Sequence, residues 1–223
     1  VAERRYVECG PAGTFTVEDV TTALDTGRRP SLLAITAASN VTGWLPPIDA
    51  IIDAAHERGI PVALDAAQLA PHRPLPAAAD YLAFSGHKLY APFGSGALVG
   101  PRSTFADGDP FLAGGGAVDL VDLDEVVWTA PPDREEAGSP NVVGAVALHG
   151  AIDELGAIGW DRIIEHETAL GLRLRQGLSD IPGVTLLGPD LASGETTLAV
   201  AAFTVGGMHH ALVAARLSAE WGI

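Results

Sequence analysis

The chain has 223 residues, of which 48% are hydrophobic and only 6% aromatic. That length can bury a sizeable core, and the composition suits alanine-rich helices on an apolar sheet. The formal charge of −15 repels a phosphate backbone, so we expect no nucleic-acid partner. The single cysteine, Cys9, excludes an internal disulfide and fits a reducing compartment. No uninterrupted apolar stretch is long enough to span a bilayer, so we also expect no membrane partner.

The first part of the chain alternates predicted helices and strands. Thr16 and Asp19 resemble the start of a capping box, although Glu or Gln is more usual at the second of these positions. Two prolines at 46–47 start a second helix, and Gly59 ends it. We predict helices over residues 16–25 and 46–56, and strands over residues 31–36, 60–64, 80–84 and 95–99. This β-α-β order predicts an α/β fold with a mostly parallel central sheet and flanking helices.

The second part of the chain begins with loops and continues with longer helices. The acidic segment 119–125 is expected to be a solvated loop, and Gly114-Gly115-Gly116 to be a turn or an anion-binding nest. We predict helices over residues 141–155, 160–178 and 210–221, and strands over residues 184–187 and 197–204. We therefore divide the chain into an incomplete large domain, residues 1–158, and the start of a smaller α+β domain, residues 159–223.

Polar side chains gather where two predicted strands end. The strand at 60–64 leads directly to Asp65 and Gln68, and the strand at 80–84 leads to Ser85, His87 and Lys88. Ligands of α/β sheets bind at the carboxyl ends of strands. The two strands are therefore expected to present a carboxylate, an amide, a hydroxyl, an imidazole and an amine to one crevice.

Lys88 is the only lysine in the chain. A desolvated lysine can lose its proton and attack a carbonyl, whereas arginine stays protonated. An isolated lysine could also be left by chance in a chain that prefers arginine. The neighbouring groups favour chemistry, because pyridoxal phosphate needs an amine for its aldehyde, an acid at its ring nitrogen and small donors around its phosphate. The sequence thus predicts a pyridoxal 5'-phosphate site.

Six spaced motifs carry a family resemblance. They are Asn40-Val41-Thr42-Gly43, Asp65-Ala66-Ala67-Gln68, His72, Ser85-Gly86-His87-Lys88-Leu89-Tyr90, Gly114-Gly115-Gly116 and Glu136-Ala137-Gly138-Ser139-Pro140-Asn141. Together they resemble class V pyridoxal-phosphate enzymes of fold type I, and most of all the cysteine desulfurases. The resemblance runs in order from about residue 31 to about residue 167.

The resemblance implies a role for each matching residue. Lys88 would form the Schiff base and act as the catalytic residue, Asp65 would pair with the pyridine nitrogen, and Gln68 would lie near the phenolic oxygen. Ser85 and His87 would hold the phosphate, and Asn40 would lie beside cofactor or substrate. Ser139 stands where the family has a hydroxyl residue that reaches the phosphate of the neighbouring subunit. The resemblance therefore also implies a homodimer with a shared active site.

The chain also departs from the family pattern. The relatives have a segment before Val1 with a phosphate-binding turn and a residue that stacks on the cofactor, and a segment after Ile223 with an arginine for the substrate carboxylate and a persulfide-forming cysteine. The chain is therefore expected to be a fragment. The resemblance implies a cytoplasmic enzyme that removes sulfur from L-cysteine, with a sulfur-acceptor protein as partner. Aminotransferase, carbon–sulfur lyase and epimerase activities stay open, as does an inactive scaffold.

Five other residues are expected to lie outside the site, and we expect no metal site. Cys9 precedes a loop and is expected to be a small, partly buried apolar residue. His72 lies among prolines, and we favour a structural role for it. Arg134 is read as a surface ion pair or a contact at a subunit boundary. Adjacent histidines at 209–210 point about 100 degrees apart on a helix, so they are expected at a helix start rather than on one metal ion. A nucleotide-binding domain is disfavoured, since neither a Gly-x-Gly-x-x-Gly nor a Walker motif is present.

Overall fold

A computed structural model describes residues 3–191 and 194–223 of the protein. Val1 and Ala2, with which the predicted large domain begins, lie outside these residues. The helices are α1 (Val17–Asp25), α2 (Ile48–His56), α3 (Arg102–Ala106), α4 (Val142–Ile158), α5 (Trp160–Ser179) and α6 (His210–Arg216), with 3-10 turns η1 (Gly86–Leu89) and η2 (Asp133–Glu135) and a π-helical turn η4 (Leu217–Trp221). The strands are β1 (Leu33–Thr36), β2 (Val62–Asp65), β3 (Tyr81–Ser85), β4 (Gly96–Val99), β5 (Val118–Val121), β6 (Val126–Trp128), β7 (Val184–Leu187) and β8 (Ala202–Val205).

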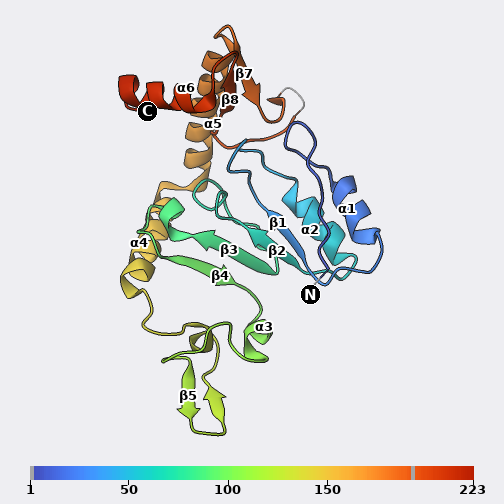
Figure 1. The fold of residues 1–223 in the computed structure, drawn as a ribbon, viewed down its shortest axis with the longest axis vertical. Coiled ribbons are helices and arrows are strands. Elements are labelled where there is room, and N and C mark those ends of the chain that lie inside the picture. The colour runs from blue at the N-terminus through green and yellow to red at the C-terminus, as the bar shows by residue number, and fades with distance from the viewer. Residues whose placement is uncertain (1–2, 192–193) are drawn as a thin grey trace.

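The central sheet has the strand order β1-β2-β3-β4. Strands β1, β2 and β3 run parallel to one another, and β4 pairs antiparallel with β3. The carboxyl ends of the three parallel strands point toward the side on which α4 lies (Figure 1). The predicted mostly parallel α/β sheet is confirmed.

The main core lies between one face of this sheet and helices α1 and α2. Apolar side chains of β1 and β2 alternate in burial along each strand, and those facing the helices pack against Ile51 and Ile52, both fully buried. The predicted capping box at the start of α1 is present, because Thr16 accepts the Asp19 N–H and the Asp19 carboxylate accepts the Thr16 N–H. The buried face of α2 thus packs against β1 and β2.

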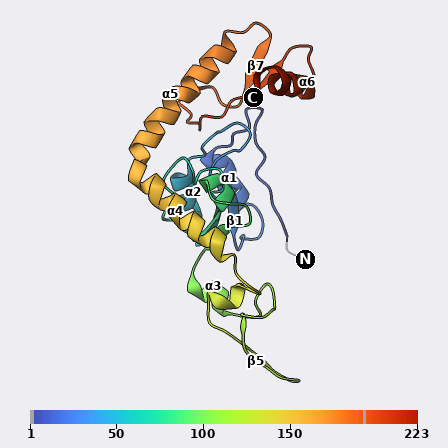
Figure 2. The ribbon, with the colours of Figure 1, turned by 90° about the vertical axis from the view of Figure 1, so that its left-hand side faces the viewer.

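A hairpin of β5 and β6 projects past α3, at the end of the molecule opposite α6 (Figure 2). Its tip, residues 122–125, is exposed, and Asp122 accepts the backbone N–H groups of Asp124 and Glu125. The expectation of a loop over 119–125 was therefore wrong for its first residues, which belong to β5. Strand pairing with β6 stabilises this acidic segment although neither strand is deeply buried.

Arg134 is buried, so the surface ion pair, one of the two roles expected for it, was wrong, and the contact at a subunit boundary stays a prediction. Its side chain is 7% exposed and donates to the backbone carbonyls of Ala106, at 2.7 Å, and Gly108. A guanidinium suits this position because it offers several donors in one plane to carbonyls that would otherwise lack partners. Arg134, which belongs to η2, thus binds the end of α3 and the segment that follows it.

Helices α4 and α5 form a bent pair along one side of the molecule (Figure 2). They meet at Gly159, whose φ is +89°, with an angle of 81° between them. In the part of the chain that the structure describes, no single helix is long and apolar enough to cross a bilayer, and only this bent pair has the length and composition together. α5 leads to the hairpin of β7 and β8 and to α6, where the start of a small α+β domain was predicted. The boundary at residue 158 stays a prediction.

The segment before β8 docks on the loop after β1. Leu198 donates its N–H to Gly43 O at 2.8 Å, and Leu45 donates to Thr196 O at 3.0 Å. The Trp44 indole donates to Glu195 Oε2 at 2.7 Å. Asn40, a predicted site residue, lies in this loop. The loop is thereby held by residues 195–198, from a distant part of the chain.

Two smaller predictions had different outcomes. Cys9 is exposed rather than partly buried, because its loop runs over the surface before α1. His209 stands at the N-cap of α6, where its Nδ1 accepts the Ala211 N–H at 3.2 Å. The prediction of a helix-start role for this histidine pair is confirmed.

Candidate functional site

The ends of β2 and β3 bring Asp65 and Ser85 to one edge of the sheet. Asp65 is the last residue of β2 and pairs with Ala83 of β3. Ser85 ends β3 two residues later, so its side chain points to the same face as those of Ala83 and Asp65. Short apolar strands thus place a carboxylate and a hydroxyl on the same face at one edge of the sheet.

Lys88 lies in η1, immediately after β3, and contacts Gln68. Its Nζ donates to Gln68 Oε1 at 3.0 Å, and both residues are half-buried. Gln68 belongs to a tight turn that follows β2, in which the Asp65 carboxylate accepts the Ala67 N–H at 2.9 Å. The two predicted strand ends therefore converge, and an amine and an amide meet between them.

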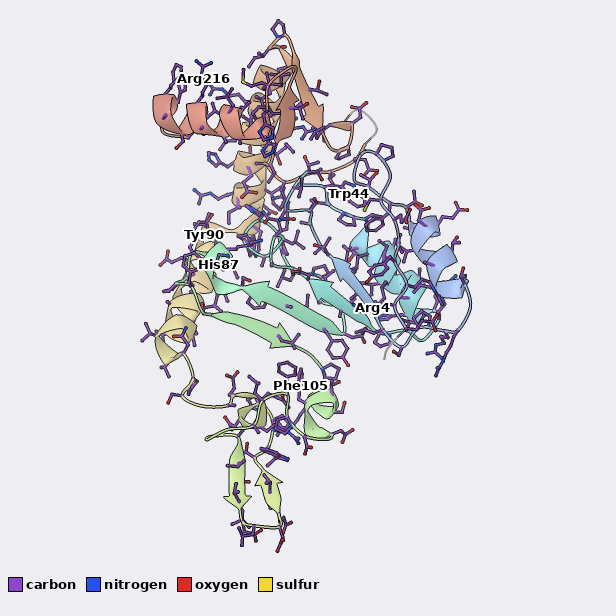
Figure 3. All side chains as sticks on the ribbon, in the orientation of Figure 1. Arg4, Trp44, His87, Tyr90, Phe105 and Arg216 are labelled. Atoms are coloured by element: carbon purple, nitrogen blue, oxygen red, sulfur yellow. The ribbon has the colours of Figure 1, made fainter. Side chains whose placement is uncertain are left out.

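The backbone around Lys88 is tightly built. Gly86 donates its N–H to Ser95 O at 2.8 Å, and a Cβ at Gly86 would collide with the Ser95 side chain. Tyr90 ends η1 with φ +64°, a left-handed conformation that is uncommon for a residue other than glycine. Figure 3 shows His87 and Tyr90 at the α4 side of the sheet. The close packing at Gly86 and the left-handed conformation of Tyr90 together fix the backbone position of Lys88.

The other predicted site residues are more exposed. His87 stacks on Phe93, with ring centroids 4.9 Å apart and an interplanar angle of 17°. Asn40 and Ser139 lie in exposed loops. Within residues 3–191 and 194–223, no hydrogen bond joins either of them to Lys88, Gln68 or Asp65. The assigned roles of these residues remain predictions.

The start of α4 is fastened beside η1 by Asn141. Its Nδ2 donates to Gly94 O at 2.9 Å, while its Oδ1 accepts the Gly144 N–H at 3.0 Å and caps the helix. One side chain thus ties the helix to the loop that contacts Gly86. No role for Asn141 was predicted from the sequence. Its position just before an apolar helical segment is the signal that could have indicated a helix N-cap.

Two hollows lie near these residues. A shallow one of about 310 Å³ covers the open face of the sheet and is lined by Asp65, Thr36 and small residues such as Ala63 and Ala83. A larger one of about 970 Å³ follows the bend between α4 and α5, where Tyr90 and Glu167 border it. Lys88 is not among the residues that line either hollow in the described parts of the chain. The contacts of the side chains, and not the shape of a cavity, therefore define the site.

The donor set fits pyridoxal phosphate. Lys88 supplies the amine, and the nearby Gln68 amide can also hydrogen-bond an oxygen on the ring. Asp65 ends a neighbouring strand with an exposed carboxylate that can pair with a protonated ring nitrogen. Ser85 and His87 flank the lysine with groups that can donate to a phosphate. The small residues on the open sheet face leave room beside the carboxylate.

Comparison with known proteins places the chain in a family. Residues 2–223 match the family model of class-V aminotransferases, so the chain belongs to this family. Class-V aminotransferases use pyridoxal 5'-phosphate, the cofactor predicted from the sequence. The family resemblance and the fold type stated above are thereby confirmed.

Within this family the chain is similar to cysteine desulfurases. It is 37% identical over 226 aligned residues to the cysteine desulfurases of Shigella sonnei strain Ss046 and Escherichia coli strain K12 / DH10B, covering 100% of this chain and 54% of each relative. The apo structure of cysteine desulfurase from Thermococcus onnurineus NA1 matches with a TM-score of 0.87 and 32% identity, over 96% of this chain and 53% of that one. The chain thus spans about half the length of these relatives.

The cysteine desulfurase CsdA of Escherichia coli, in its S-sulfonic acid form, matches with a TM-score of 0.79 and 32% identity. That alignment covers 90% of this chain and 50% of CsdA. These two solved structures therefore share the fold of this chain over 96% and 90% of its length.

Proposed function

We propose that this protein is a pyridoxal-phosphate enzyme of the cysteine desulfurase type, acting on L-cysteine through a Schiff base at Lys88. The observation that carries the proposal is the hydrogen bond between Lys88, the only lysine of the chain, and Gln68. Lys88 follows the end of β3, and Gln68 follows the end of β2, whose last residue is Asp65. The 37% identity to cysteine desulfurases supports the choice of substrate.

Pyridoxal phosphate, when bound, supplies an aldehyde for the lysine amine and a ring that withdraws electrons from the substrate's alpha carbon. Gln68 would orient the Lys88 amine by accepting its hydrogen bond, and would later help to hold the phenolic oxygen. Asp65 would keep a proton on the ring nitrogen, because a carboxylate stabilises a neighbouring cation. Ser85 and His87 would donate hydrogen bonds to the phosphate.

Lys88 has a second task once a substrate amine has replaced it. The freed Lys88 amine would take up or return the proton of the alpha carbon as general base or acid. Asn40 would contact cofactor or substrate from the loop after β1, which the segment 195–198 holds in place. The chain's own residues thus bind, orient and move a proton.

The same family assignment extends the proposal to the assembly. We place Ser139 at the cofactor phosphate of a partner subunit in a homodimer, because it lies in an exposed loop at the start of α4 rather than beside Lys88. A cytoplasmic location and a sulfur-acceptor protein complete the proposal.

The test is an assay of products from L-cysteine, with pyridoxal phosphate and with dithiothreitol to supply two reducing electrons. Equal amounts of alanine and sulfide from the unsubstituted protein, and none from Lys88→Ala, would support desulfuration. Pyruvate, ammonia and sulfide would indicate a lyase. Formation of 3-mercaptopyruvate together with the amino acid that corresponds to an added keto acid would indicate an aminotransferase, and loss of chirality of the substrate would indicate an epimerase. Absence of every product would favour an inactive scaffold and contradict the proposal.

A further inference from the structure

Glu167 joins helix α5 to the loop that carries Gln68. Its Oε1 lies 2.6 Å from His72 Nδ1, and its Oε2 accepts a hydrogen bond from Arg73 Nη1 at 3.0 Å. The side chains of Glu167, His72 and Arg73 are 17%, 23% and 15% exposed. Hydrogen bonds that involve an ionised group in partly buried surroundings are stronger than surface ion pairs. We call these three residues the Glu167 clamp.

The clamp holds one end of a short, rigid turn. Leu69 O accepts the N–H groups of both His72, at 2.9 Å, and Arg73, at 3.0 Å, so the backbone is wound into a helical turn. The other end of the turn is fixed by the hydrogen bond between Asp65 and the Ala67 N–H. The segment therefore has two anchors, one at the sheet edge and one at α5.

Gln68 lies between these two anchors. It precedes His72 by four residues, in consecutive turns closed by the bond from Ala70 N–H to Ala66 O at 2.8 Å and by the bonds to Leu69 O. Any rotation of the turn at His72 would therefore also move the Gln68 amide relative to Lys88 Nζ, its partner at 3.0 Å. The clamp is thus attached to the same short segment as Gln68, whose contact with Lys88 it does not itself make.

We propose that Glu167 is a positioning residue for the cofactor site. It holds the turn so that Gln68 receives the hydrogen bond from Lys88, and so keeps the lysine amine in place for the aldehyde of pyridoxal phosphate. The claim that Glu167 holds the turn does not depend on the proposed function, because the clamp exists without cofactor. The claim that it keeps Lys88 in place for pyridoxal phosphate rests on the proposed function. His72 and Arg73 of the clamp lie in the loop after β2, and Glu167 lies in α5, 94 residues after Arg73.

The test compares Glu167→Gln with Glu165→Gln. The first change keeps the size of the clamp side chain and removes its charge, whereas Glu165 lies exposed on the same helix and serves as the matched control. Two readouts are needed: hydrogen–deuterium exchange of peptides covering residues 66–73 without cofactor, and the rate at which the Schiff-base absorbance grows after addition of pyridoxal phosphate. We expect exchange to become about tenfold faster and Schiff-base formation about tenfold slower in Glu167→Gln, the effect of losing one charge-assisted pair. Glu165→Gln should change neither.

A second variant removes the same pair from the loop side. Arg73→Gln should accelerate exchange as well, and the double variant should add little to Glu167→Gln, because coupled residues are not additive. Additive effects would overturn the clamp.

The outcomes separate the two halves of the proposal. Unchanged exchange in Glu167→Gln would overturn the clamp. Faster exchange with Schiff-base formation at the unsubstituted rate would overturn the positioning role and leave an ion pair that only stabilises the fold. If the unsubstituted protein forms no Schiff base at all, the proposed function and the positioning role fail together, while the exchange comparison still decides whether Glu167 holds the turn.

Discussion

Gly43 is the position where the docking of the C-terminal segment on the loop after β1 can be tested most sharply. It has φ +73°, and a Cβ placed there would lie 3.0 Å from Val200 Cβ and 3.1 Å from Leu198 O. Leu198 is buried, with 1% of its surface exposed, and Val200 is partly buried and packed against the same core, so a Cβ at residue 43 would press on packed neighbours. Substitution by alanine therefore combines a left-handed backbone with a steric conflict.

The expected cost of Gly43→Ala has two parts. A left-handed conformation costs a residue with a Cβ about 1–2 kcal/mol. Overpacking against a fixed neighbour adds about 1–3 kcal/mol. Gly207 has the same φ of +73° but nothing within 4 Å of its Cβ position, so Gly207→Ala should lose only the first part. The difference between the two variants measures the close approach alone.

Urea unfolding of the two variants, followed by circular dichroism, gives the free energies of unfolding. We expect Gly43→Ala to be less stable than Gly207→Ala by about 1–3 kcal/mol, with similar dependence on urea. Equal stabilities would show that residues 198–200 do not press on the loop, and would refute the described junction beside Asn40.

Three further predictions concern the site, the core and pH. Asp65→Asn removes the charge expected at the cofactor ring, so the affinity for pyridoxal phosphate should fall about tenfold or more in a titration of Schiff-base absorbance; an unchanged affinity would exclude Asp65 from this role. Ile51→Ala empties a fully buried position and should destabilise the protein by about 2–5 kcal/mol in urea, and a loss well below that range would contradict the described core. Burial, the largest influence, raises the pKa of Asp80, but hydrogen bonds from His56 and the Val62 N–H outweigh it, so the net pKa of Asp80 lies below its ordinary value. The stability from Asp80 is thus present above the unfolded pKa and is lost as pH falls through the folded one, so Asp80→Asn should flatten the acid side of a stability–pH profile, and parallel profiles would contradict the contacts.

The sheet and the helices around it could be predicted because their signals are local. Apolar runs mark β2 and β3, and Thr16 with Asp19 marks the start of α1, so short stretches of sequence were sufficient. The hairpin β5–β6 was missed because Asp119 interrupts its first strand and little of it is buried. Pairing between its own two strands, rather than burial, holds it together.

The convergence of Lys88 with Gln68 could also be predicted, because parallel strands end at the same edge of a sheet. The burial of Arg134 could not, since its partners are backbone carbonyls 26 and 28 residues earlier, which carry no side-chain signal. The Glu167 clamp was missed for a related reason: a bent helix pair returns Glu167 to His72 from 95 residues away. Only the three-dimensional arrangement brings these charges together.

The central claim is that Lys88 forms the Schiff base, and borohydride reduction tests it directly. Because the chain has a single lysine, reduction in the presence of pyridoxal phosphate should attach one pyridoxyl group to the peptide that contains Lys88, detectable by mass spectrometry. Lys88→Arg keeps the positive charge, cannot form the bond and serves as the control. We predict modification of Lys88 in the unsubstituted protein and none in this variant. An unmodified Lys88 in the folded protein, or equal modification of the Lys88→Arg variant at another group, would contradict the account.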